Sequence, residues 1–340
     1  MTRSGFTATA GLSANKLAQQ VVQPRPDDRM CGSRFRRTSE LASPVRLCMM
    51  TNAMSARRSW LLLAPLAVLS PGVAAQGPDD VLEVLSHVSD HVRDYYGRAQ
   101  SIVCTERVMV QPINADISSA GFARVLEYEL RVDWQPAEGG NPPQATIVRN
   151  LKKVNGRAAR PGDEPKCMDP RAISPEPLAF LLPVNRDEYV FSLRGAGRDG
   201  RRPALMLDYQ TRVDKPGRPE VTVKDDCTTF SVPEGVKGRI WLDPTTHDIM
   251  RFDEGLKRRF DVRVPYDSAR FGTPYFFSVE RLDSSIRYRS VVFHDPDETV
   301  WLPESIESLT IVRGGGHVGN RTTQRFSDYR RFLTAGRIVE

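Results

Sequence analysis

Apolar and polar residues alternate along most of the chain after residue 100, and this pattern predicts a long series of β-strands. The stretch 124–134 is the clearest case, because apolar side chains occupy one side and charged side chains occupy the other. Its apolar side consists of Leu126, Tyr128, Leu130, Val132 and Trp134. Such alternation is typical of an antiparallel strand with one buried and one solvated face.

Similar patterns recur between short stretches of turn-forming residues, so we expect roughly ten to twelve strands in all. The further predicted strands are 102–110, 145–154, 189–193, 205–213, 221–224, 260–264, 275–279, 286–292, 299–302, 306–313 and 322–332. Asn155-Gly156, which follows one of these strands, is a signal for a tight hairpin turn.

Residues 238–253, Gly-Arg-Ile-Trp-Leu-Asp-Pro-Thr-Thr-His-Asp-Ile-Met-Arg-Phe-Asp, predict a β-hairpin within this series. Ile240 and Leu242 alternate with their neighbours on the first arm. The Asp-Pro-Thr-Thr run at 243–246 has the composition of a turn, and 249–252 leads back along a second arm.

An amphipathic helix is expected before the first strand. Asp80 can cap its start, Glu83 stands three residues further on, and Gly97 ends the pattern. The apolar residues between them recur at helical spacing, and they are Val81, Val84, Leu85, Val88, Val92 and Tyr95. A helix with one apolar face needs a surface to cover, and the strands that follow provide a sheet.

A second, short and very apolar helix is predicted to begin at Ser174, with Pro175 at its first position, and to end at Pro183. It contains Phe180 and Leu181. Such a segment between strands suits a cover over a concave sheet, and it is equally explained as an ordinary part of the core. Because helices do not alternate with the strands, the fold class is mainly β (α+β) with an antiparallel sheet, and 76–340 forms a single β-rich domain.

The first 75 residues have the features of a leader. Arg57 and Arg58 precede the apolar run 61–69, and small residues follow up to Ala75. This order of regions predicts a signal peptide at 54–75 that is cut near Ala75, with an uncleaved anchor as the alternative. Residues 1–53 lack periodicity and are expected to be a disordered extension or the product of a start codon placed too early. The mature protein is therefore expected to be periplasmic or secreted and not an integral membrane protein.

The net charge of +6 arises from the leader. Residues 1–75 contain ten Lys and Arg but only three acidic residues, which leaves about −1 for 76–340. A nucleic-acid partner, which a basic chain would otherwise suggest, is excluded on this ground.

Three cysteines lie beyond the leader. Cys104 has the strand parity of apolar neighbours and is expected to be buried. Cys167 and Cys227 lie in polar, loop-like contexts, and an oxidising compartment would allow a disulfide between them. Because the number is odd, one thiol is left over.

Candidate catalytic and metal-binding residues are few. His87 and His91 are four residues apart on the predicted helix, but a third ligand is not evident, so solvated histidines are the better interpretation. His247 and His294 lie in turns beside Asp residues, but the sequence contains no G-x-S-x-G nucleophile motif. We therefore predict no catalytic residue, metal or cofactor, and a non-enzymatic protein. A hydrolase with an unrecognised site is a third possible function.

The hairpin at 238–252 resembles the "G-x-hydrophobic-W-hydrophobic-D-x-x-T-x-x-hydrophobic-x-R" hairpin of the LolA/LolB/RseB superfamily. Val300-Trp-Leu-Pro303, leading into 306–313, is similar to a strand start in the same proteins. The resemblance implies a curved, unclosed β-barrel whose mouth is covered by helices. It also implies a periplasmic lipoprotein carrier, chaperone or lipid sensor that holds acyl chains on the apolar concave side.

The leading hypothesis is therefore a non-enzymatic binding protein for an acyl chain or another apolar ligand, such as a lipid. The candidate ligand-binding residues are inward-facing aromatics with two lid residues, namely Tyr128, Trp134, Phe191, Tyr209 and Tyr288 with Phe180 and Leu181. The alternative for each of them is an ordinary core position. The second hypothesis is a stress-sensing or protein-interaction module that binds an envelope partner along a sheet edge or groove.

Overall fold

The computed structural model describes residues 19–22, 78–99, 101–135, 144–163, 178–212, 217–224, 227–233, 235–264, 276–294, 297–314 and 319–331. The predicted signal peptide and nearly all of 1–53 lie outside these residues, so the leader stays a prediction.

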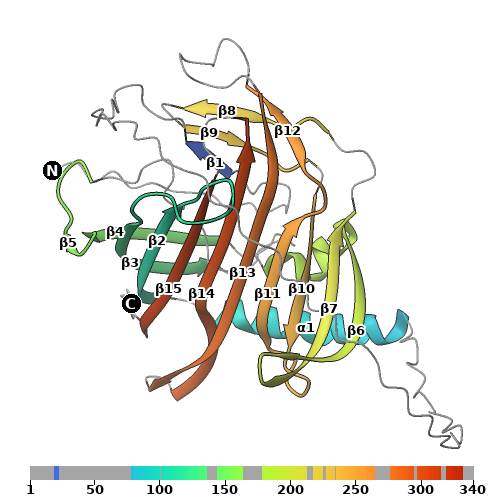
Figure 1. Ribbon diagram of the computed structural model, residues 1–340. Coiled ribbons are helices and arrows are strands. Elements are labelled where there is room, and N and C mark those ends of the chain that lie inside the picture. Colours follow the sequence, from blue (N-terminus) through green and yellow to red (C-terminus); the bar gives the residue numbers. More distant parts are fainter. Residues whose placement is uncertain are drawn as a thin grey trace, which may run out of the picture. The chain divides into compact units, whose positions relative to one another are not determined.

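One antiparallel sheet of twelve strands forms most of the described structure, as predicted (Figure 1). Its order is β5-β4-β3-β2-β15-β14-β13-β11-β10-β7-β6, and β12 also pairs with β13. The strand direction turns strongly between β4 and β6. The terminal strands of the sheet, β5 and β6, are not paired with each other in the described residues. The predicted curved, unclosed sheet is confirmed. Its strands are β2 (Ile102–Pro112), β3 (Arg124–Gln135), β4 (Gln144–Val154), β5 (Arg157–Ala158), β6 (Tyr189–Asp199), β7 (Arg202–Thr211), β10 (Val236–Leu242), β11 (Ile249–Leu256), β12 (Phe260–Arg263), β13 (Phe276–His294), β14 (Asp297–Arg313) and β15 (Gly319–Arg331).

A second, small antiparallel sheet has the order β1-β9-β8. Its strands are β1 (Gln19–Val22), β9 (Cys227–Phe230) and β8 (Val221–Lys224). Phe230 at the end of β9 packs edge-on against Phe260 of β12 and Phe277 of β13, with both ring centroids 5.8 Å away. The small sheet therefore extends the core of the large one. Strand β1 lies within the region for which the sequence analysis expected no regular structure.

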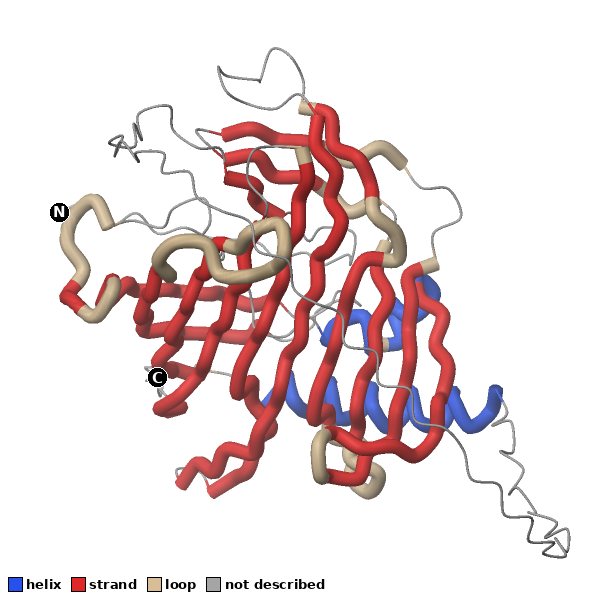
Figure 2. The backbone as a smooth tube through the Cα atoms, viewed as in Figure 1, coloured by secondary structure: helices blue, strands red, loops and turns tan. Residues whose placement is uncertain are grey.

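Helix α1 (Pro78–Arg98) crosses one face of the large sheet, behind the strands in the view of Figure 2. Two 3₁₀ turns lie on the same face, η2 (Leu178–Leu181) and η3 (Pro183–Glu188). We call the face that carries α1 and these turns the inner face, and the opposite one the outer face. The predicted short helix is thus a 3₁₀ turn where it is described, and Pro183 starts a second turn.

The core lies on the inner face and forms one large cluster with a smaller satellite. The apolar stripe of α1 faces it through Val84, Leu85, Val88 and Val92, all of which are buried. Inward positions of the strands alternate with exposed ones, as the period of two requires. Cys104 is buried here, as predicted.

The hairpin and turn predictions are confirmed in detail. Strands β10 and β11 pair from Val236 to Leu256, and the turn between them is held by Asp243, whose carboxylate accepts hydrogen bonds from the backbone N–H groups of Thr245 and Thr246. Asn155 and Gly156 both have positive φ, as a two-residue hairpin turn of this kind requires.

Two pairs of short predicted strands are in fact single long strands. Strand β13 runs from Phe276 to His294 and so joins the predicted strands at 275–279 and 286–292 as far as they are described, and β14 joins 299–302 to 306–313. The register between them shifts at Val279/Arg281 and again at Arg287/Tyr288. A bulge adds one residue and resets the alternation, so a pattern of period two looks interrupted where the strand continues.

Candidate ligand-binding site

Five aromatic side chains from four separate elements meet on the inner face. Phe180 of η2 is at the centre, with its ring centroid 4.8 Å from Tyr209, 5.1 Å from Tyr189 and 5.6 Å from Phe252. Phe191 stacks on Phe180 at 6.2 Å. These five residues are called the ring cluster below. Ring pairs at 4.5–7 Å attract one another beyond the area that they bury.

Strand parity brings the sheet members of the ring cluster together. Tyr189 and Phe191 are two residues apart on β6, so both face inward, and Phe191 pairs directly with Tyr209 of β7. Phe252 reaches the same place from β11, where it stacks on Tyr209 with the two ring planes 14° apart. Phe180 covers them from above the sheet.

The η2 turn, Leu178–Leu181, is called the lid, since all four of its side chains are buried against the inner face. Its backbone is fastened to α1 through Ser89, whose Oγ lies 2.8 Å from the carbonyl oxygens of both Leu85 and Leu181. Arg186 of η3 donates to the same two carbonyl oxygens and to Ser89. Burial lowers the pKa of the Arg186 guanidinium. A small number of polar bonds therefore positions the lid.

The carboxyl group of Glu254 reaches the ring cluster. Glu254 of β11 is partly buried, and Tyr209 Oη donates a hydrogen bond to its Oε2 at 2.9 Å. Burial raises the pKa of Glu254 to about 7, although the Tyr209 hydrogen bond acts in the opposite direction. Burial also raises the pKa of Tyr209 and of Tyr189, with Glu254 as the next cause. The site therefore combines apolar rings with one proton-exchanging acid.

Of the seven predicted ligand-binding residues, the structure brings Phe180, Phe191 and Tyr209 into contact. Leu181 is buried beside them in the lid. Tyr288 is buried in the main core on β13. The side chain of Trp134 and residue Cys167 lie outside the described part of the chain, as does the side chain of Cys227, so the predicted disulfide stays a prediction.

Tyr128 belongs to the satellite cluster with Val108, Val110, Leu126 and Val154. A buried ion pair lies next to it, in which Arg149 of β4 donates to Glu106 of β2 at 2.7 Å. The Arg149 guanidinium lies 4.2 Å from the Tyr128 ring centroid. Tyr128 thus packs beneath a charged pair and not within the ring cluster.

Three residues of this site, Tyr189, Phe252 and Glu254, are not among the ligand-binding residues predicted from the sequence. Tyr189 and Phe252 have the inward parity of Phe191 and Ile240, so the alternation already contained that signal. For Glu254 the signal is an acid at the inward parity of Phe252, in a hairpin whose other inward positions are apolar or glycine.

The outer face of the same strands has the opposite character. Asp208 of β7 accepts hydrogen bonds from Arg239 and Arg194, and Asp253 of β11 accepts them from Arg251. Burial acts to raise the pKa of Asp208, but these two arginines outweigh it and lower that pKa.

Trp241 extends this polar layer, since the Arg251 guanidinium lies 4.5 Å from its ring centroid. The outer face is thus covered by paired charges and an arginine stacked on a tryptophan.

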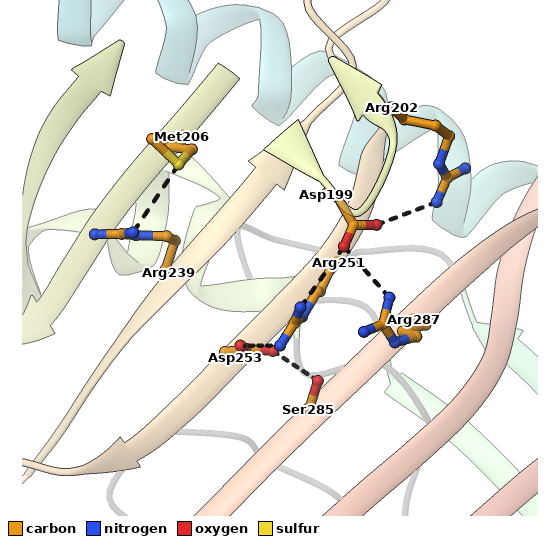
Figure 3. A network of polar contacts seen from close by, with 8 residues as sticks. All are labelled: Asp199, Arg202, Met206, Arg239, Arg251, Asp253, Ser285 and Arg287. Atoms are coloured by element: carbon orange, nitrogen blue, oxygen red, sulfur yellow. Dashed lines mark hydrogen bonds and ion pairs between the residues drawn. The ribbon is translucent and has the colours of Figure 1, made fainter. Parts of the chain in front are cut away.

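Asp199, at the tip of the β6–β7 hairpin, joins three strands of this face (Figure 3). Its side chain is only 2% exposed, and it lies 3.2 Å from Arg202, 3.3 Å from Arg287 and 3.6 Å from Arg251. The bulge at Leu193/Gly195, where Gly195 has a φ of +81°, bends the hairpin so that its tip reaches β11 and β13.

A groove of about 820 Å³ lies over this charged face. It runs from β6 and β7 across β10, β11, β13 and β14 to Arg321 of β15. Its walls mix the paired charges with Trp241, Leu309 and Val190, and its lining also includes Tyr209, Glu254, Ser284 and Ser308. The sequence analysis proposed a surface groove only in general terms, because no local pattern marks a hollow that spans seven strands.

The predicted helical histidine pair meets a third histidine. His247, in the β10–β11 turn, stacks on His87 with ring centroids 5.0 Å apart, and His91 lies 3.5 Å from Asp248. Burial lowers the pKa of His247, and the neighbouring His87 and His91 lower it further. His294 and Asp297 form a separate, highly exposed pair.

No group of three or more His, Cys, Asp or Glu side chains in the described part of the chain is arranged to hold a metal ion. Among the helices assigned there, none has the length and apolar character needed to cross a membrane.

No protein-family model and no curated protein sequence matches the chain. Solved structures with a similar fold include a DUF1329 family protein from Desulfovibrio piger, with 11% identity, a TM-score of 0.38, and coverage of 75% of this chain and 95% of the other. An outer membrane lipoprotein-sorting protein domain from Vibrio parahaemolyticus has 12% identity, a TM-score of 0.32 and the same coverage.

A LolA superfamily protein from Nitrosomonas europaea has 9% identity and a TM-score of 0.30, and the alignment covers 75% of this chain and 97% of that one. At these identities and scores the likeness concerns the fold alone. One of these structures belongs to the LolA superfamily, which the hairpin resembles, but TM-scores of this size do not assign the chain to it.

Proposed function

We propose that this protein is an exported, periplasmic, non-enzymatic binding protein for an acyl chain or another apolar ligand. The observation that carries the proposal is the ring cluster under a short lid. Four inward aromatics of the sheet are covered by a single 3₁₀ turn, whose central residue, Phe180, is itself an aromatic side chain. A ligand that displaces Phe180 would find an apolar surface already formed.

The lid is short enough to move as a unit. Four residues contribute its contacts to the sheet, and its polar attachment to the helix depends on Ser89 and Arg186. An acyl chain would replace the contacts of Phe180 with its own, so apolar area stays covered in both states. Ligand pockets of this kind are mostly apolar with few polar groups, and here Glu254 and Tyr209 are such groups.

The test is binding of a fluorescent fatty-acid analogue to delipidated protein. We expect saturable fluorescence that an unlabelled long-chain lipid displaces. Phe191→Asp places a charge in the ring cluster and should reduce the affinity at least tenfold, and Phe191→Ala should have a smaller effect in the same direction. Val148→Asp is the matched control, because Val148 is 45% exposed on β4.

Circular dichroism and thermal unfolding would establish that each variant is folded. If the wild-type protein gives no saturable signal with any chain length, the proposal is wrong.

The outer groove favours a second candidate function, a module that binds an envelope protein. Its volume and mixed charged and apolar lining are those of a surface for a polypeptide segment. Under this alternative, Trp241→Ala and Lys237→Glu in the groove should abolish recovery of a stable envelope partner by crosslinking. The same variants should leave fatty-acid binding unchanged, so the two candidates are separable.

A further inference from the structure

A row of polar residues crosses the inner face next to the ring cluster. Glu254 of β11 pairs directly with Ser284 of β13, which pairs with Ser308 of β14, which pairs with Thr322 of β15. Thr322 is buried, and the other three are partly buried. The row begins at the ring cluster and leads away from it, so a ligand that lies on the rings would meet hydroxyl groups and one carboxyl at its end.

Gly238 keeps the start of this row open. It stands between Tyr209 and Glu254 on the intervening strand β10 and pairs with both. A Cβ atom at Gly238 would lie 2.5 Å from Cε1 and from Oη of Tyr209. The absence of a side chain is thus what lets the phenol cross β10 and reach the carboxyl group. Gly238, the first residue of the predicted hairpin at 238–253, thus leaves room for the Tyr209–Glu254 contact.

Glu254 differs from the acids of the outer face in having no cation. Asp208, Asp253 and Asp283 each form an ion pair with an arginine. Among the described residues Glu254 forms none, and its single hydrogen bond comes from the neutral Tyr209 hydroxyl. An ionised carboxylate has about four acceptor positions, so most of its capacity is open to a donor.

We propose that Glu254 anchors the head group of the bound amphiphile, and that this head group is a cationic amine. This inference rests on the function proposed above, because it assigns the polar end of the same ligand. An ammonium group donates three hydrogen bonds, and it can be shared between Glu254 and the hydroxyls of Ser284 and Ser308.

An anionic head group would face the Glu254 carboxylate, which forms no ion pair among the described residues, so we expect an anionic ligand to bind more weakly than an amine. The raised pKa supports this assignment, since it is what an acid without a cation shows on burial, and a bound ammonium would lower it again. The affinity for an amine should therefore rise with pH between 6 and 8, as Glu254 ionises while the amine stays protonated.

The test compares three ligands with the same chain, namely dodecylamine, dodecanol and dodecanoate, as competitors of a neutral fluorescent acyl probe. At pH 8 we expect dodecylamine to bind at least tenfold more tightly than dodecanol, and dodecanoate to bind most weakly. Glu254→Gln should remove the preference for the amine and its pH dependence, and leave the affinity for dodecanol within about twofold. Glu280→Gln is the control, because Glu280 lies on β13 and pairs with Arg313.

The outcomes separate the two proposals. If none of the three ligands displaces the probe, and the probe itself does not bind, the proposed function fails. If all three bind equally, or dodecanoate binds most tightly, or Glu254→Gln changes nothing, the head-group assignment is overturned while the apolar site stands.

Discussion

Asp253 and Glu254 are consecutive acids on one strand, yet they belong to chemically opposite surfaces. Asp253 faces outward, where Arg251 and Ser285 donate hydrogen bonds to it at 2.8 and 2.6 Å. Glu254 faces inward to the ring cluster, where it has only the Tyr209 hydroxyl. Asp253 is therefore an acid paired with arginine on the outer face, whereas Glu254, the next residue, is an acid without an ion-pair partner next to aromatic rings.

The charged groups on the two faces therefore affect stability and function differently. Paired charges on an exposed sheet contribute little to the free energy of folding but keep the surface solvated. An acid without a cation on the inner face costs free energy, and proteins retain such groups mainly at functional sites. The inner face is accordingly where we place ligand binding, and four stability experiments test the contrast.

The largest difference is expected between Phe252→Ala on the inner face and Trp241→Ala on the outer face. Phe252 is 1% exposed and stacks on Tyr209, so its removal should lower the free energy of unfolding by about 4 kcal/mol. Trp241 is only partly buried, so its truncation should cost about 1 kcal/mol. Urea unfolding measures both, and equal costs would contradict the assignment of the faces.

Gly238→Ala should cost about 3 kcal/mol, because the new Cβ would collide with the Asp253 carbonyl oxygen and the Tyr209 ring. Gly97→Ala is the matched control. No atom lies within 4 Å of the Cβ position at Gly97, which is in helix α1, so this change should stabilise the protein by up to about 1 kcal/mol. If Gly238→Ala leaves the free energy of unfolding unchanged, the Tyr209 side chain does not need the space above Gly238 to cross β10.

Glu254→Gln tests the charge on the inner face through pH. Because the folded-state pKa is raised to about 7, above the unfolded value, the folded protein holds its proton more firmly. The contribution of Glu254 is therefore most favourable in acid and is lost as the pH rises from about 4.5 through 7, by at most about 3 kcal/mol. The variant should be more stable than the wild type at pH 8 and should lack this decline.

Asp208→Asn is the outer-face counterpart of that experiment. The pKa of Asp208 is lowered, so its contribution to stability is present at neutral pH and is lost as the pH falls through the folded-state pKa. The two variants should therefore differ from the wild type at opposite ends of the pH range. Curves that shift in the same direction would refute the contrast.

The smallest of the four effects is expected at the hairpin tip. Asp199→Asn leaves three arginines around a neutral side chain that is 2% exposed, and it should cost about 2 kcal/mol. Asp283→Asn breaks an exposed pair with Arg281 and should cost less than about 0.5 kcal/mol. If the two variants are equally stable, the buried carboxylate does not hold the tip to the sheet.

Much of the fold could be read from local patterns. The strand 221–224 has the predicted ends, and the hairpin turn at Asp243 and the Asn155-Gly156 turn form as their composition indicates. Where prediction failed, the cause was a feature that a local pattern does not contain. The bulges of β13 shift the alternation, so one strand of 19 residues resembled two short ones.

The site was predicted only in part for a similar reason. Phe180, Phe191 and Tyr209 meet, while Tyr128 has the same inward parity but lies seven strand-to-strand steps from Tyr209 in the sheet order. Alternation along a strand determines which face of the sheet a side chain occupies, whereas the order of the strands determines which side chains are its neighbours. That order depends on pairings such as β15 with β2, which join residues more than 200 positions apart.

Alternating side chains and turn residues, read from the sequence alone, determined that this chain forms an antiparallel sheet with one apolar face, since both signals act within a few residues. Only the tertiary structure decided that Gly238 lets Tyr209 reach Glu254, and that the acid next to it in sequence is paired with arginine. These contacts depend on which strands lie side by side, and that is a property of the whole chain.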